Sequence, residues 1–421
     1  PRDYIPNPES CLITGISPQM ALERGLCEHE FIAQILAKYL EPATCGVGYN
    51  SIRFDDEVTR NSLYRNLYDP FAREWQFGNS RWDLLGVVRM ARALRPEGIN
   101  WPKDKEGRLT LRLDHLTVAN GIAHEDAHDA LGDVRATLAL ARLLKTAQPK
   151  LFRYLWEHRS KKAVLELVAP GQMRPFLIAS TRMASEAQNL GIAVVVGRQP
   201  ENPNALIIYD LRFSPEESLT GKVLSEGEGG PFSILHINRA PALAPMSALR
   251  RQDEARLGLD VATHMKHLAQ LVPLPYHNAP GYAFLTQPFD SSHRGDVDLG
   301  LYAGFATERD RQRLERYRRP EGVDFLAMPD EFDDPRFREL CWRYKARNFP
   351  EYLTPEEARD WERFCRDKWM SKLHGAGLSL HEFMEKVNAL RVSLGTDDKK
   401  MAILNETERY VRNLTQPDCL A

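Results

Sequence analysis

The first third of the chain alternates strand-length apolar runs with helix-spaced apolar positions, a pattern typical of α/β domains. The apolar run Cys45–Asn50 predicts a buried strand. Asp55 follows and predicts a helix start, because carboxylates favour the exposed amides of a first turn. Two further helices are expected, over 82–94 and 131–145. The second of these rests on four helix-spaced apolar positions, Leu131, Val134, Leu138 and Ala141. We expect the α/β domain to occupy residues 1–149.

The middle of the chain changes to β-branched runs separated by turn residues, which predicts a small antiparallel β domain over 150–284. The expected strands are Phe176–Ile178, Ala193–Val196, Leu206–Tyr209 and Ile234–Ile237. Beyond it, amphipathic periods predict a helical domain over 285–421. The expected helices are Arg309–Arg318, Asp334–Ala346, Pro355–Trp369, His381–Leu390 and Lys399–Arg412.

Composition narrows the class of protein without naming a function. The 421 residues are 43% hydrophobic and 27% charged, as in an ordinary globular protein of two or three domains. No apolar stretch approaches the roughly 20 residues of a membrane helix, and no signal peptide opens the chain, which favours the cytoplasm. The six cysteines form no C-x-x-C pair, so reduced thiols are expected. The net charge of -2 does not by itself favour a nucleic-acid partner.

Asp55 is the first candidate for chemistry, because it follows a strand end, where α/β folds place their ligands. Its neighbours Asp56 and Glu57 make the segment acidic. The alternative is structural, with Asp55 capping a helix and the other two carboxylates solvated. The segment alone favours that alternative.

A second candidate segment, His124–Asp133, permits two interpretations. His124 and His128 spell H-E-x-x-H, the pattern in which two histidines on one helical face bind zinc in a protease. An Asn-Gly pair lies just upstream and no third ligand is apparent, so we do not favour this interpretation. The other pairs His128 with Asp133 as an H-x-x-x-x-D element beside metal ions. Five residues turn a helix by about 140°, so His128 must then lie at the helix entrance.

The second interpretation implies a metal-dependent nuclease. Carboxylates such as Asp55 and Asp133 suit Mg²⁺ or Mn²⁺, which prefer oxygen ligands. Two such ions can clamp the attacking and leaving oxygens of a phosphodiester. His128 could take the proton of the attacking water, because its ordinary pKa is about 6.5.

Long blocks of the sequence resemble bacterial exonuclease I. They are GYNSIRFDDEVTRN with YRNLYDPF, NSRWDLL with ALRPEGINWP and NGIAHEDAHDALGDVRAT, and HIN with YKARNFP. The resemblance implies an α/β ribonuclease H-like exonuclease domain, then a small β-barrel of the Src-homology type, then an α-helical domain. It implies 3′→5′ hydrolysis of single-stranded DNA with two Mg²⁺ ions, in DNA repair and recombination, by a monomer.

The resemblance also assigns residues. Asp55 and Asp133 match metal-binding acids, and His128 matches the general base. The positions that match DNA contacts are Arg60, Phe71, Trp75, Arg89, Leu111 and Arg112. Arginines suit phosphates and aromatic rings suit unpaired bases, although core packing or a solvated helix face would explain Phe71, Trp75 and Arg89 equally well. Arg95 and Tyr154 match positions that dock the C-terminal tail of single-stranded-DNA-binding protein.

The family also carries a D-x-E motif, upstream of the match to Asp3–Pro6, that has no counterpart in these 421 residues. We expect catalysis to depend on that pair of acids. A polypeptide limited to these residues is therefore expected to lack metal-dependent activity. The alternative function is a catalytically inactive single-stranded-DNA-binding fragment.

Overall fold

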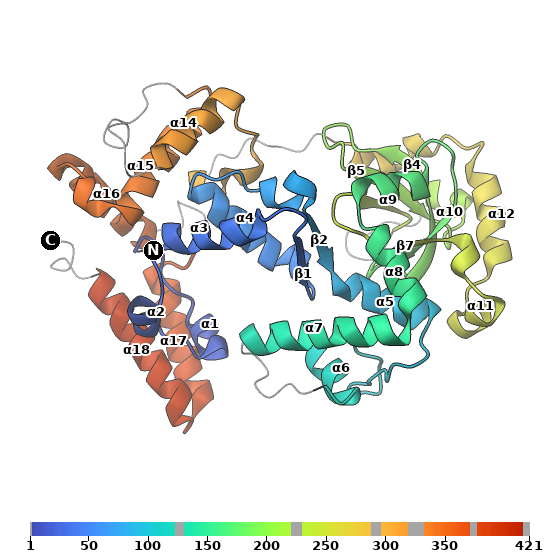
Figure 1. Cartoon of the computed structure of the whole chain (residues 1–421), viewed down its shortest axis with the longest axis horizontal. Coiled ribbons are helices and arrows are strands. Elements are labelled where there is room, and N and C mark those ends of the chain that lie inside the picture. The colour runs from blue at the N-terminus through green and yellow to red at the C-terminus, as the bar shows by residue number, and fades with distance from the viewer. Residues whose placement is uncertain are drawn as a thin grey trace. The chain divides into compact units, whose positions relative to one another are not determined.

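The computed structural model describes residues 2–122, 130–219, 230–287, 296–318, 332–370 and 377–415 (Figure 1). Its internal contacts define two compact units. The helical unit comprises Pro1–Thr44, Asp55–Asn79 and Asp290–Ala421, and the sheet unit comprises Cys45–Phe54 and Ser80–Phe289. Within the described ranges, no helix has the length and apolar character needed to span a membrane.

A short parallel strand pair begins the sheet unit. β1 (Cys45–Gly48) pairs with β2 (Ser80–Asp83) from Cys45 opposite Ser80 to Gly48 opposite Asp83. The strand predicted at Cys45 is confirmed, but its predicted burial is wrong, since Val47 is 41% exposed and the other three residues are only half-buried. The helix expected from Trp82 begins later, as α5 (Leu84–Leu94), because Trp82 lies in β2 and packs edge-on against Phe152 and Trp156. That correction adds a strand that the helical pattern of apolar residues concealed.

Four more helices follow α5: α6 (Leu113–Ala119), α7 (Ala130–Ala147), α8 (Pro149–Glu157) and α9 (Lys161–Val168). The helix predicted over 131–145 is confirmed as α7. Its predicted apolar stripe does not face the core, since Leu131, Val134 and Leu138 are 54%, 55% and 48% exposed. Leu140 and Leu144 make the core contacts instead. Two apolar stripes share this helix, and periodicity cannot choose between them.

The antiparallel sheet predicted for the middle of the chain is confirmed. Its strand order is β6-β5-β4-β3-β7, every pair antiparallel. The strands are β3 (Phe176–Ala179), β4 (Leu190–Arg198), β5 (Ala205–Asp210), β6 (Phe232–His236) and β7 (Leu243–Pro245). Hydrophobic cores cover both faces, which explains why β-branched runs without polar alternation form these strands. The accompanying helices are α10 (Pro215–Leu219), α11 (Arg251–Leu257), α12 (Val261–Leu271) and α13 (Pro280–Leu285).

The helical unit draws on both ends of the chain. From the first part come α1 (Pro8–Thr14), α2 (Pro18–Arg24), α3 (Glu28–Tyr39) and α4 (Asp55–Arg65). From the last part come α14 (Glu308–Arg318), α15 (Arg336–Asn348), α16 (Pro355–Met370), α17 (Leu380–Leu394) and α18 (Asp398–Thr415). These last five confirm the predicted C-terminal helices. Figure 1 shows α1 and α2 packed beside α18, so segments at opposite ends of the sequence share one core.

A buried network of charges also joins the two ends of the sequence. Asp3, whose exposure is 0%, accepts from the Arg347 guanidinium at 2.8 Å, and Lys368 Nζ lies 3.3 Å from the same carboxylate. Arg343 and Asp298 extend the network at 2.9 Å. Burial opposes ionisation of Asp3, but the Arg347 and Lys368 charges outweigh it and hold its pKa below the ordinary value.

Candidate functional site

The loop between β1 and α4 is shaped by Asp83, a residue that the sequence did not single out. Its Oδ1 accepts from the backbone N–H of Asn50 at 2.8 Å and of Leu85 at 2.9 Å. Asn50 adopts the left-handed conformation, with φ of 59°. Asp83 therefore fixes the turn that leads toward Asp55 while it caps α5. The only signal in the sequence was an aspartate preceding an apolar helical run, which suggests a cap and nothing more.

Asp55 is the first residue of α4, and it is exposed. The two neighbouring acids form ion pairs with arginines of the same unit. Asp56 is buried and accepts from Arg73 at 2.7 Å, and Glu57 pairs with Arg60 at 2.6 Å. Among the three acids in this turn, Asp55 is the one presented to solvent, which suits a metal or substrate ligand.

Asp133 lies half-buried in the first turn of α7. His124 and His128 fall outside the described residues, so the H-x-x-x-x-D geometry stays a prediction. The described part of the chain contains no group of three or more histidine, cysteine or acidic side chains arranged to hold a metal. Asp55 and Asp133 belong to different compact units, each at the start of a helix.

Three of the predicted DNA contacts lie in the sheet unit. Arg89 is half-buried, and it makes no ion pair or hydrogen bond with the described residues. Burial lowers the pKa of its guanidinium, an effect that the nearby Tyr49 and Asp83 only partly offset. The Leu111 carbonyl accepts from the Tyr49 hydroxyl, which ties β1 to the approach to α6. Arg112 is exposed and makes two hydrogen bonds to Asp114, at 3.1 and 2.9 Å. Arg89 is thus the cation best placed to gain a phosphate partner.

The other predicted DNA contacts lie in the helical unit. Trp75 is 64% exposed, which excludes core packing as its role. Phe71 is half-buried with the Arg60 guanidinium 5.3 Å from its ring centre. The Arg60 side chain is only 3% exposed and is held by Glu57 and Glu74. The two rings are available for stacking to different degrees, whereas Arg60 is enclosed.

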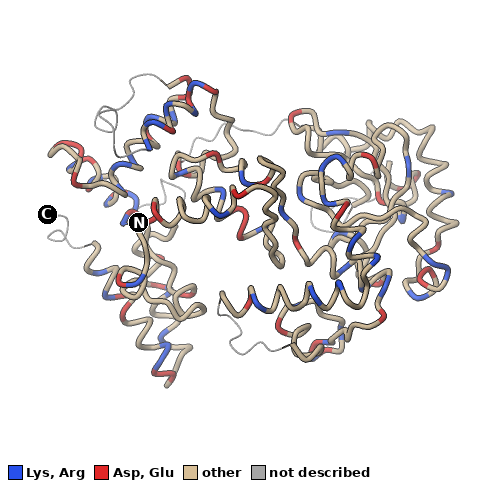
Figure 2. The backbone as a smooth tube through the Cα atoms, viewed as in Figure 1, with Lys and Arg blue, Asp and Glu red and all other residues tan. Residues whose placement is uncertain are grey.

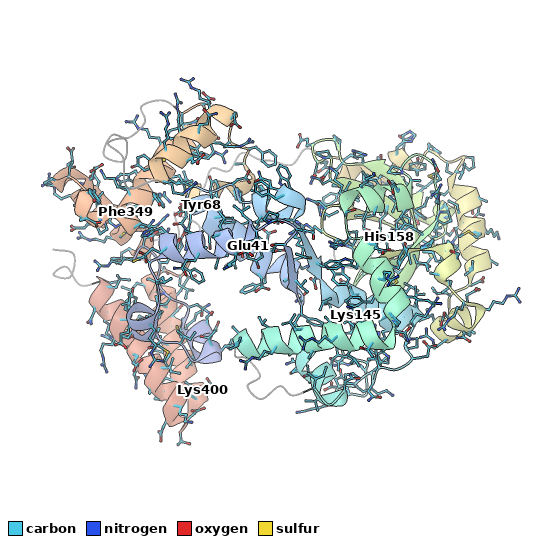
Figure 3. All side chains as sticks on the ribbon, in the orientation of Figure 1. Glu41, Tyr68, Lys145, His158, Phe349 and Lys400 are labelled. Carbon is cyan, nitrogen blue, oxygen red and sulfur yellow. The ribbon has the colours of Figure 1, made fainter. Side chains whose placement is uncertain are left out.

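Arg95 and Tyr154 lie on neighbouring helices, Arg95 at the C-terminal end of α5 and Tyr154 within α8. Arg95 donates to the Ala248 carbonyl at 3.0 Å and lies 3.5 Å from Asp253. The Tyr154 ring stacks on His158, labelled in Figure 3, with centroids 3.9 Å apart. Its buried hydroxyl has no hydrogen-bond partner within the described ranges, and burial raises its pKa to about 12.

Comparison with known proteins identifies the family. Three family models match in succession: an exonuclease model over residues 2–141, the exonuclease I SH3-like domain over 159–277 and the exonuclease I C-terminal domain over 295–414. The exodeoxyribonuclease I of Escherichia coli K12 is 38% identical over 425 residues, covering 98% of this chain and 88% of that protein.

Comparison with solved structures gives the same family. E. coli exonuclease I in complex with a dA16 oligonucleotide matches with a TM-score of 0.90 and 37% identity, covering 98% of this chain and 90% of that one. A structure described as SSB/exonuclease I in complex with an inhibitor matches with a TM-score of 0.87 and 36% identity, covering 98% and 89%. The fold is thus an exonuclease domain, an SH3-like domain and a helical C-terminal domain, as the sequence predicted.

The exonuclease model spans the segment that holds His124, His128 and Asp133. This favours the H-x-x-x-x-D interpretation over the zinc-protease pattern. The positions of the domain boundaries and the roles of individual residues stay predictions. The chain belongs to the exodeoxyribonuclease I family of metal-dependent exonucleases.

Proposed function

We propose that this protein hydrolyses single-stranded DNA from its 3′ end and releases nucleotides, as part of DNA repair and recombination in the cytoplasm, acting as a monomer. The observation that carries the proposal is the match to exodeoxyribonuclease I over nearly the whole chain, with all three domains in family order. The oligonucleotide bound to the E. coli relative supports a single-stranded substrate.

Two Mg²⁺ ions, or Mn²⁺ in their place, are the proposed cofactors. Asp55 and Asp133 would supply carboxylate oxygens, the donor type that these ions prefer. Both fit this role, because each lies at the start of a helix with its side chain exposed or half-exposed. When bound, the ions would stabilise charge on the oxygens of the scissile phosphodiester. His128 is the proposed general base, which accepts the proton of the attacking water.

The proposed path of the DNA strand is lined by arginines and by aromatic residues. Arg89 and Arg112 would neutralise phosphates, and Leu111 would contact a sugar or base edge beside them. Phe71 and Trp75 would stack on unpaired bases, which is tolerant of sequence because every base has a π-face. Arg60, the remaining matched position, is enclosed by Glu57 and Glu74, so direct contact with the strand is least favoured there. The exposure of Trp75 supports this assignment, as does the Arg89 guanidinium, which makes no ion pair or hydrogen bond with the described residues.

A second proposed ligand is the C-terminal tail of single-stranded-DNA-binding protein, at Arg95 and Tyr154. The complex described for the relative supports such a partner. An acidic peptide that ends in a carboxylate would pair with Arg95, while its aromatic residue packs beside Tyr154. The unbonded Tyr154 hydroxyl could donate to a peptide carbonyl or carboxylate.

The Asp133→Asn variant tests the proposed reaction in a protein that also carries the D-x-E pair on which catalysis is expected to depend. It keeps the shape of the side chain but removes the charge of a metal ligand, so hydrolysis of a single strand in Mg²⁺ should fall by at least about a hundredfold while strand binding is largely kept. Release of labelled nucleotides measures the rate, and fluorescence anisotropy measures binding. Asp360→Asn, which changes an aspartate in a surface pair with Arg363, is the matched control. An unchanged rate in Asp133→Asn would contradict the metal role.

A further inference from the structure

Three aromatic rings gather on the surface of the helical unit. Phe305 is 81% exposed and Tyr302 is 51% exposed. The Phe71 ring centre lies 5.9 Å from that of Phe305 and 6.2 Å from that of Tyr302. We call Phe71, Tyr302 and Phe305 the aromatic platform. Single exposed rings are common, but a contiguous exposed apolar group is typical of a binding surface.

The platform rests on the buried side chain of Arg60. Arg60 Nε and Nη2 donate to the two carboxylate oxygens of Glu74 at 2.7 and 2.9 Å. Its Nη1 donates to Glu57 at 2.6 Å and to the Tyr302 hydroxyl at 3.2 Å. The guanidinium also lies 5.3 Å from the Phe71 ring centre. One side chain therefore fixes two of the three rings.

This arrangement leaves Arg60 poorly suited to bind a phosphate directly. Its side chain is 3% exposed, and two carboxylates already oppose its single positive charge. A phosphate at this point would meet Glu57 and Glu74 as well as the guanidinium, and like charges in a partly buried site repel. The planar Arg60 guanidinium instead makes two parallel hydrogen bonds to Glu74, and this bidentate pair holds the arginine in a fixed position.

A second arginine braces the loop that carries Tyr302 and Phe305. Arg336, on α15, donates to the Gly300 carbonyl and, at 3.4 Å, to the Gly304 carbonyl. A Cβ at Gly300 would lie 3.1 Å from the Tyr64 hydroxyl and 3.2 Å from Arg336 Nη1, so the close approach favours glycine. The rings are thus held in place before a ligand arrives, which lowers the entropic cost of binding.

The charges beside the platform do not favour a purely electrostatic ligand. On α14, Arg309 pairs with Asp333, and Arg311 pairs with Glu308. Figure 2 shows acidic and basic positions interleaved along this helix. A ligand recognised here must therefore bind chiefly through the faces of the rings, which is how unpaired bases bind to aromatic side chains.

We propose that Phe305, with Phe71 and Tyr302, stacks on unpaired bases of the single strand, and that Arg60 is a positioning residue that holds this platform rather than a phosphate ligand. The proposal rests on the proposed function, because it takes single-stranded DNA as the ligand. It adds Phe305 and Tyr302 to the DNA-binding surface. It assigns Arg60 an indirect role, in which Arg60 holds the Phe71 and Tyr302 rings that contact the DNA.

Binding of a fluorescent oligothymidylate, measured without divalent metal, tests the platform. Phe305→Ala should weaken binding by about tenfold, the usual size of one lost stacking contact. The loss should disappear with an abasic strand, which keeps the phosphates but has no bases. Phe31→Ala, which removes another exposed ring of the same unit, should have no effect. Because Phe305 is so exposed, its replacement should leave the fold intact.

Two substitutions at Arg60 separate the roles of positioning and phosphate binding. Arg60→Lys keeps the charge but loses the fork to Glu74, so a positioning role predicts a loss similar to that of Phe305→Ala, and the two losses should not add in the double variant. Arg60→Gln should leave the dependence of binding on salt unchanged. A phosphate ligand would instead be rescued by lysine, and its loss in Arg60→Gln would lower the salt slope by about 0.7.

The outcomes distinguish this proposal from the proposed function. Full binding by Phe305→Ala, or equal losses with normal and abasic strands, would overturn the platform while leaving the exonuclease function in place. Lysine rescue with a reduced salt slope in Arg60→Gln would overturn the positioning role. Failure of the unaltered protein to bind any single strand would overturn both. Thermal unfolding of each variant verifies that the fold is kept, and Phe305→Ala decides the stacking claim even if an Arg60 variant unfolds.

Discussion

At the scale of single residues, partners and burial distinguish side chains that the sequence treated alike. Arg60, Arg89 and Arg112 were all assigned to DNA contact. In the structure Arg60 is enclosed by two carboxylates, Arg112 pairs on the surface with Asp114, and Arg89 has neither kind of partner among the described residues. Residue type indicated which side chains could bind phosphate, but the neighbours that compete for each charge come from elsewhere in the fold.

Arg89→Ala should weaken single-strand binding and reduce the slope of log K against log salt by about 0.7, the value for one released counterion. A half-buried cation that makes no ion pair or hydrogen bond with the described residues gains most from a phosphate, because it has no existing pair to break. Titrations at several salt concentrations measure both quantities. Arg112→Ala is the control, and its effect should be smaller, since Asp114 already offsets that charge. An unchanged slope in Arg89→Ala would exclude a direct phosphate contact.

At the scale of helices and strands, much of the fold could be predicted from sequence. Periodicity located β1, α7, four of the antiparallel strands and the five C-terminal helices, and the acidic first turn at Asp55 located α4. It missed β2, because Trp82 continues the helical pattern of α5, and it chose the wrong stripe of α7. Both errors have one cause. A local pattern records which residues are apolar, whereas the partners that bury them are set by tertiary contacts.

The site was harder to predict than the elements that carry it. Local pattern favoured a helix cap at Asp55, and only the long blocks of family resemblance gave it a chemical role. Asp83 and the Phe305 ring were not identified, because their significance depends on contacts with Asn50 and Phe71 that are distant in sequence. His128 lies outside the described residues, so its role stays a prediction.

The packing of α5 against α8 places the proposed tail-binding residues, Arg95 and Tyr154, on neighbouring helices. Replacing both by alanine should weaken binding of an acidic C-terminal peptide by at least about tenfold, because the peptide loses a charge partner and a ring contact together. Anisotropy of a labelled peptide measures the affinity. Arg153→Ala, which removes an exposed cation from the same helix, should bind normally. Unchanged affinity in the double variant would remove this assignment.

At the scale of the whole molecule, the helical unit depends on a network of buried charges that joins the start of the chain to α15 and α16. Asp3→Asn should destabilise the fold by about 3–5 kcal/mol, because Arg347 and Lys368 would keep their charges without this carboxylate. Urea unfolding at neutral pH measures the change. Asp360→Asn, which breaks a surface pair with Arg363, should cost less than about 1 kcal/mol.

The same network predicts a dependence of stability on pH. The pKa of Asp3 and that of Asp298 lie below their ordinary values in the folded protein, since the cationic partners outweigh the effect of burial. Their contribution is therefore present above about pH 4, the unfolded value, and is lost as the pH falls below it. The Asp3→Asn variant should lose less stability on acidification than the unaltered protein. An equal loss would show that Asp3 does not contribute.

The most direct test of the central claim incubates a protein that carries these residues together with the D-x-E pair with a single DNA strand that has different labels at its two ends. The account predicts that, in Mg²⁺, the 3′ label is released first and as a mononucleotide, that a duplex is left largely intact, and that Asp133→Asn binds the strand without releasing either label. Early release of the 5′ label, internal cutting, or binding of the strand with no release at all by a protein that also carries the D-x-E pair would contradict a 3′→5′ exonuclease.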